Sequence, residues 1–127
     1  MRARFRPSCI AAAAWAVAAS AQARRIARRG DLLDARLLPP PPLPDSAGSG
    51  VAGVLARTKA SCLVRSLVLQ AWHASHDRER DVVVGVRHTT GAVEAHAWLE
   101  GERNDGEYVE LVRRPAALRR QIAEPLP

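Results

Sequence analysis

Three blocks between residues 61 and 100 decide the fold: SCLVRSLVLQAW (61–72), DVVVGVR (81–87) and VEAHAWLE (93–100). Apolar residues cover most of the circumference of the first block, which predicts a central, buried helix over residues 62–75. The second block is β-branched, as in a strand covered on both faces, and its Gly85 allows another backbone to approach closely. In the third block apolar residues alternate with mostly polar ones, which predicts a half-buried strand with His96 on its mixed polar face.

Cys62 is predicted to stand in the first turn of that helix, because Ser61 is a good N-cap residue. The unpaired amides and the positive end of the helix dipole favour an anion there. A thiolate gains from this position, and the Cys62 amide can hold an oxyanion. A cysteine that only fills the core gains nothing. We therefore predict Cys62 as a nucleophile and His96, on a later strand, as its base.

The order and spacing of these blocks resemble one family in particular. Cys-Leu-x-Arg-Ser-Leu-x-Leu-Gln, Val-x-Val-Gly-Val and Ala-His-Ala-Trp-Leu-Glu are similar to the transglutaminase-like leader peptidase domain of lasso-peptide biosynthesis, the B protein or its C-terminal half. The resemblance covers roughly residues 51–105. It implies an α+β, papain/transglutaminase-like cysteine-enzyme domain, with N-terminal helices followed by a small antiparallel sheet packed on the Cys-bearing helix.

The same resemblance implies a function. The protein would be a cysteine peptidase that removes the leader from a ribosomally made lasso precursor. It would work with a separate leader-recognition protein, and a lasso cyclase would act next. ATP dependence is known in some members of the family, but the sequence holds no phosphate-binding loop, and no cofactor or metal is evident. Another acyl transfer on the same scaffold, or a non-catalytic peptide-binding scaffold, is the alternative.

The acid that orients the histidine is the open point. The family's acid best matches Asp105, in Asn104-Asp105. If the chain reverses at residues 101–102, Asp105 lies diagonal to His96 and Glu107 lies opposite it. Residues 104–106 are the stronger turn signal, and a turn there leaves His96 without an acid. We predict Cys62, His96 and Asp105 as the triad, with Glu107 in reserve.

The positive charge is concentrated at one end of the chain. The formal net charge is +6 over 127 residues, but residues 1–30 carry seven Arg and no acid. The remaining residues hold 12 basic against 13 acidic side chains, so the rest is nearly neutral. Because a nucleic-acid interface needs its charge on the folded domain, we exclude a nucleic-acid partner. Two cysteines make no disulfide framework.

The N-terminal segment permits two interpretations. Three Arg precede an Ala-rich run at residues 9–19, and Ala21-Gln22-Ala23 is a small-residue cleavage site, the outline of a signal peptide. Alternatively, residues 8–29 form a structural helix ended by Gly30. We favour the helix and a cytoplasmic location. If residues 1–23 are instead a signal peptide that is cleaved after Ala23, the protein would be exported. The apolar run is too short for a membrane span.

The predicted layout has three parts. Residues 1–38 form a basic, Ala-rich helical segment with a short helix at 31–38, residues 39–50 a Pro/Gly linker, and residues 51–127 the catalytic domain. That domain begins with a helical segment at 51–58 and ends with a strand at 107–112 and a helix at 116–123. His73 and His76 share a helix face and suggest zinc, but polar residues at a helix end are the simpler interpretation.

Overall fold

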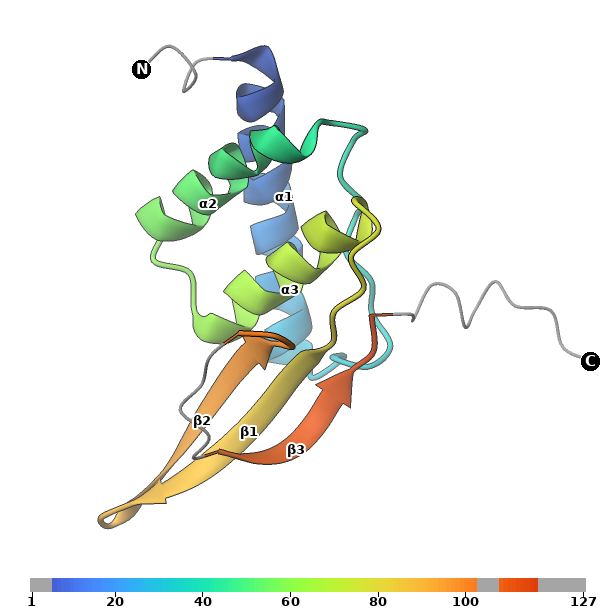
Figure 1. Cartoon of the computed structure of the whole chain (residues 1–127). Helices are drawn as coiled ribbons and strands as arrows, with labels where there is room; N and C mark the ends of the chain where they lie inside the picture. The colour runs from blue at the N-terminus through green and yellow to red at the C-terminus, as the bar shows by residue number, and fades with distance from the viewer. Residues whose placement is uncertain (1–5, 103–107, 117–127) are drawn as a thin grey trace, which may run out of the picture.

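A computed structural model describes residues 6–102 and 108–116 of the chain. Its helices gather at one end of a small antiparallel sheet, and the β1–β2 hairpin extends away from them (Figure 1). This arrangement confirms the predicted α+β class, with the sheet packed on the Cys-bearing helix. The elements are α1 Pro7–Arg29, the 3-10 turn η2 Asp45–Ala47, α2 Gly48–Arg57, α3 Cys62–Ala74, β1 Val82–Thr89, β2 Ala92–Leu99 and β3 Val109–Arg114.

Helix α1 is part of the hydrophobic core, as the structural interpretation of the N-terminus predicts. It buries a stripe of small side chains together with Trp15 and Ile26. The small side chains let α2 come so close that a Cβ at Gly50 would overlap the Cys9 carbonyl. Gly30 ends the helix in the left-handed conformation, and its N–H donates to Ile26 O at 2.9 Å. Among the described residues, no helix is long and apolar enough to cross a membrane.

The predicted short helix at residues 31–38 is wrong. One turn forms, in which Ala35 N donates to Asp31 O at 2.9 Å, and residues 35–38 have no regular secondary structure. Side chains of α1 take over the backbone groups of Leu38: Trp15 Nε1 donates to its carbonyl at 2.9 Å, and Gln22 Oε1 accepts from its N–H at 2.8 Å. These contacts, and the prolines that follow, replace helical hydrogen bonds. Helix α2 starts at Gly48, three residues before the predicted start.

Helix α3 lies at the centre of the molecule, as its apolar circumference predicts. Leu67 and Val68 are fully buried and share one cluster with Val82 and Leu99 of the sheet. Trp72 continues this cluster toward α1, where its ring lies 6.1 Å from that of Trp15. One core therefore joins the three helices to the near end of the sheet.

The sheet order is β2-β1-β3, which corrects the predicted hairpin between β2 and β3. His96 lies opposite Gly85 of β1, and Glu110 of β3 lies opposite Gly85 on its other side. Residues 109–114 therefore pair with β1 and not with β2, in neither of the two predicted registers. The chain does turn at residues 100–102, where Glu102 N donates to Leu99 O at 2.9 Å. The candidate acids Asp105 and Glu107 lie outside the described residues, as does most of the predicted helix at 116–123.

Candidate active site

Cys62 is the first residue of α3, as predicted. Ser61 takes the extended N-cap conformation, with φ −65° and ψ 162°, and its Oγ accepts from Val64 N at 3.2 Å. Within the described part of the chain, no group accepts a hydrogen bond from the backbone N–H of Cys62 or of Leu63. Two backbone donors at the positive end of a helix dipole therefore remain available to an anion beside the sulfur.

The Cys62 sulfur lies at the outer edge of β2, beside the predicted base. The N–H of Ala97 donates to Sγ across 3.3 Å. Ala97 follows His96, so standard backbone dimensions place Sγ within about 6 Å of the His96 Cα. Cys62 is only partly buried, so a substrate can reach it. The fold thus places the sulfur of the predicted nucleophile against the backbone of the strand that carries the predicted base.

The imidazole of His96 is held by aromatic rings. It stacks on Trp98 with ring centroids 5.7 Å apart, and it meets the Tyr108 ring at 5.1 Å. Trp98 and Tyr108 also touch, at 5.8 Å. No hydrogen bond among the described residues joins the His96 ring to the Cys62 sulfur. In this arrangement the imidazole therefore has no direct hydrogen bond through which to take the proton of the thiol.

Gly85 makes room for this aromatic cluster. A Cβ at this position would lie 3.0 Å from Trp98 Cη2 and 2.8 Å from Val109 O. The close approach predicted for Gly85 is therefore confirmed, and it allows β3 to bring Tyr108 over the His96 face. Sequence analysis missed Tyr108, because its place depends on β3 pairing with β1.

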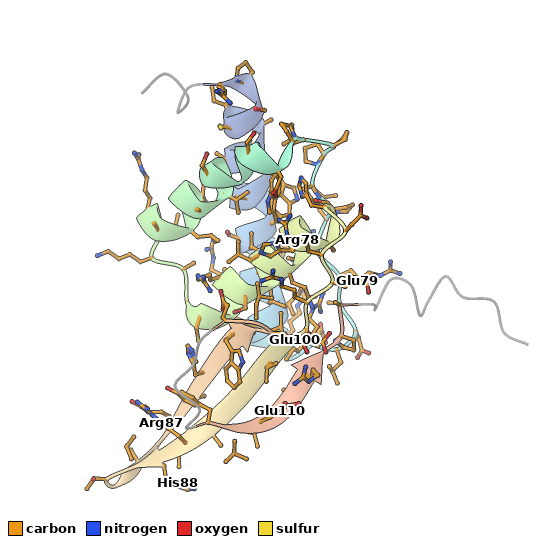
Figure 2. All side chains as sticks on the ribbon, in the orientation of Figure 1. Arg78, Glu79, Arg87, His88, Glu100 and Glu110 are labelled. Carbon is orange, nitrogen blue, oxygen red and sulfur yellow. The ribbon has the colours of Figure 1, made fainter. Side chains whose placement is uncertain are left out.

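Arg87 extends the cluster toward the β1–β2 hairpin. Its guanidinium carbon lies 5.0 Å from the centroid of the Tyr108 ring, and its Nε bonds Glu94 at 2.7 Å. Figure 2 shows Arg87 farther toward the hairpin than Glu100 and Glu110. Period-2 alternation along β1 puts Arg87 on the same face as Gly85, and this signal could have identified it.

A second ion pair joins the start of α3 to the end of β2. Arg65 donates to both carboxylate oxygens of Glu102, at 2.9 and 3.3 Å, and Glu102 Oε1 also accepts from Leu99 N at 3.0 Å. Partial burial raises the pKa of Glu102, but the bonds from Arg65 and Leu99 outweigh it, so that pKa is lowered. We call these three residues the α3–β2 clamp. Because Arg65 lies one turn after Cys62, the clamp helps to set the contact between Sγ and Ala97.

The third member of the triad stays a prediction. The carboxylates that the structure describes on the sheet are each bound by an arginine: Glu94 by Arg87, Glu102 by Arg65, and Glu100 and Glu110 by Arg113. Asp105 and Glu107 lie between Glu102 and Tyr108 in the sequence, outside the described residues. Both acids therefore remain candidates.

The two histidines at the end of α3 have structural partners. His73 Nδ1 accepts from Arg78 Nε at 2.8 Å, and the ring nitrogens of His76 lie 2.9 Å from the carbonyl oxygens of Trp72 and Leu43. Across residues 6–102 and 108–116, no group of three or more His, Cys, Asp or Glu could hold a metal ion. These contacts support the interpretation of a polar helix end over a zinc site.

Comparison with known proteins agrees with this geometry. A family model described as the transglutaminase-like superfamily matches residues 2–118. No curated protein and no solved structure gives a significant match. The superfamily includes cysteine peptidases and acyltransferases, and its members typically depend on a cysteine. With a family match over nearly the whole length, and a cysteine at a capped helix start beside a histidine strand, the chain belongs to the transglutaminase-like superfamily.

Proposed function

We propose that this protein is a cysteine peptidase that removes the leader from a ribosomally synthesised lasso-peptide precursor. The observation that carries the proposal is the position of Cys62, on a capped helix start with its sulfur against the strand of His96. The sequence resemblance at the Cys62, Gly85 and His96 blocks supports the peptide substrate. The proposal includes a cytoplasmic location.

The chemistry follows from these positions. His96 takes the proton of the Cys62 thiol, and the thiolate attacks the scissile carbonyl of the leader. The Cys62 amide, with that of Leu63, stabilises the oxyanion. The C–N bond then breaks as His96 returns the proton to the leaving amine, which leaves a thioester on Cys62. Water, deprotonated by His96, hydrolyses this thioester and frees the leader. An acid, Asp105 or Glu107, would hold the imidazole orientation.

The proposal includes a recognition protein in trans and a cyclase that receives the core peptide, as the family resemblance implies. We expect the gene to lie beside genes for a short precursor and an asparagine-synthetase-like cyclase. A dependence on ATP would follow from the family resemblance alone.

The direct test is cleavage of that precursor in the presence of the recognition protein, followed by mass spectrometry. The wild-type protein should release the leader, whereas Cys62→Ala and His96→Gln should not. Cys9→Ser, which changes the other thiol, should retain activity. If Cys62→Ala still cuts the precursor, the cysteine mechanism is wrong.

Acyl transfer to an amine is the second enzymatic candidate, because the same thioester can react with an amine instead of water. Adding glycine ethyl ester to the assay separates the two reactions. A peptidase gives a leader with a free carboxylate, and a transferase gives the amide.

A non-catalytic scaffold is favoured by one observation, the stacking of His96 on Trp98 and Tyr108 without a hydrogen bond to Cys62. Such a protein would bind the leader without cutting it, and its binding would be unchanged by Cys62→Ala.

A further inference from the structure

A buried arginine, Arg114, lines a pocket that is formed partly by α3. Arg114, at the end of β3, is only 5% exposed. Its Nε donates to Gln70 Oε1 at 2.8 Å, and its Nη1 donates to Leu32 O and Ala35 O at 2.5 and 2.6 Å. All these acceptors are neutral. The two N–H groups of Nη2 have no acceptor in the described part of the chain.

The charge of Arg114 lacks a counterion among its described neighbours. Burial lowers its pKa, and no carboxylate acts against that effect. The neighbouring carboxylate of Asp81 is engaged by Arg113 at 3.1 Å and by the N–H of Ala116 at 2.8 Å. A buried charge is normally paired, because removing an ion from water costs several kcal/mol. The site is therefore half complete: a cation with two free donors and no anion.

The space beside these donors is a pocket of about 280 Å³. Arg114 and the exposed Arg36 contribute its positive charge, and no acid from residues 6–102 or 108–116 lines it. The remaining wall is mostly apolar, from the chain after α1 and from one face of α3: Leu37, Pro39, Pro40, Leu67, Ala71 and Ala74. Arg114 lines this pocket and its unpaired Nη2 is not fully enclosed, so we infer that the two free donors face the pocket.

We propose that this pocket binds an organic carboxylate with a short apolar chain. The carboxylate accepts hydrogen bonds from Nη2 of Arg114, and the positive charge of Arg36 at the rim attracts it. The apolar chain lies against Leu67 and Ala71. The volume is at the small end for ligand sites, which suits a molecule of a few carbons or the last residue of a peptide. The site lies along α3 from Cys62 and does not depend on the peptidase activity.

The test uses the full chain and measures the thermal midpoint and NMR shifts with hexanoate. Hexanoate at ten times its Kd should raise the midpoint saturably, on the order of 5 °C. Hexanol, which lacks the charge, and acetate, which lacks the apolar chain, should act much more weakly. An N-acetylated dipeptide with a free carboxylate separates the two sources: tighter binding than hexanoate indicates a peptide end, and weaker binding a free small acid.

Variants locate the effect. Arg114→Gln should weaken hexanoate binding at least about 10-fold, because it removes a charged hydrogen bond. Arg36→Gln should weaken it about 2- to 5-fold, since exposed charges contribute little. Ala74→Phe fills part of the pocket while both arginines are kept, and it should abolish binding, so the test does not depend on how Arg114→Gln folds. Arg28→Gln, on the exposed side of α1, is the control and should bind like wild type.

Two results would overturn the proposal. One is the absence of a saturable hexanoate effect in the wild-type protein. The other is an equal effect in wild type and Ala74→Phe, which would place any binding elsewhere and leave Arg114 as a structural link to the carbonyls of Leu32 and Ala35.

Discussion

The two cysteines of this protein lie at two helix contacts of different kinds. Cys9 lies where α1 meets α2, is 7% exposed, and has its sulfur 3.5 Å from Ser49 Oγ. Cys62 lies where α3 meets β2, is partly exposed, and stands beside unpaired amides. At the α1–α2 contact the two backbones pack tightly through Gly50. At the α3–β2 contact the amide donors of Cys62 and Leu63 stay unpaired among the described residues. The difference teaches that the position of a thiol in its helix, rather than its presence, separates a packing residue from a nucleophile.

The largest expected effect is on the α1–α2 contact. Gly50→Ala should lower the free energy of unfolding by about 2–3 kcal/mol, because the added methyl overlaps the Cys9 carbonyl. Gly53→Ala in the same helix is the matched control. Its Cβ meets nothing within 4 Å, and it should raise stability by about 0.5–1 kcal/mol. Chemical denaturation measures both, and equal effects would show that the helices do not pack through Gly50.

The next effect concerns the aromatic face beside Cys62. Gly85→Ala should cost about 1–2 kcal/mol and displace Trp98, since the methyl would lie 3.0 Å from its ring. Fluorotryptophan NMR can follow the three tryptophans separately. The Trp98 resonance should shift, while those of Trp15 and Trp72, in the helical layer, should remain. Shifts of all three would mean that the two regions are not independent.

The α3–β2 clamp should matter more for rate than for stability. Glu102→Gln should lower kcat about 10-fold, because a small displacement of β2 from α3 misplaces Cys62 relative to His96. Its cost in stability should stay below about 1 kcal/mol, since the pair with Arg65 is partly exposed. Asp45→Asn removes the ion pair with Arg78, away from the site, and should leave kcat unchanged. A large loss of stability with unchanged kcat would contradict this role.

The smallest effect is the pH dependence contributed by His73. Burial, and then the charge of Arg78, lower the pKa of His73 in the folded protein. The unfolded chain therefore binds this proton more readily, and stability falls as the pH drops through about 6.5, the unfolded value. Because the side chain of His73 is only partly buried, the loss at pH 5.5 should be a few tenths of a kcal/mol. His73→Gln should flatten the dependence of the urea midpoint between pH 7.5 and 5.5, and an unchanged slope would exclude His73 as its source.

The sequence predicts the local part of this structure well. Three signals depend only on neighbours within a few residues: Ser61 as N-cap, the apolar circumference of α3 and the alternation around His96. These signals are enough to place Cys62 at a helix start and His96 on a strand. Helix α1 follows in the same way from its alanines and Gly30.

What depends on distant partners is not predicted. Consecutive strands usually pair, and this tendency led to the wrong hairpin between β2 and β3. Strand β3 pairs instead with β1, and Gly85 has no side chain to block its close approach. This pairing brings Tyr108 to His96. Likewise, residues 31–38 have helical spacing, but the side chains of Trp15 and Gln22 bind the backbone groups of Leu38 in place of helical partners.

The most direct test of the central claim is the rate of alkylation of each cysteine by iodoacetamide in the native protein, read by peptide mass spectrometry together with leader cleavage. We predict that Cys62 reacts at least about 100-fold faster than Cys9, that precursor peptide protects it, and that cleavage falls in proportion to its modification. Cys9 should react only after unfolding. Equal rates for the two thiols, or full cleavage by protein alkylated at Cys62, would contradict the assignment of Cys62 as the nucleophile.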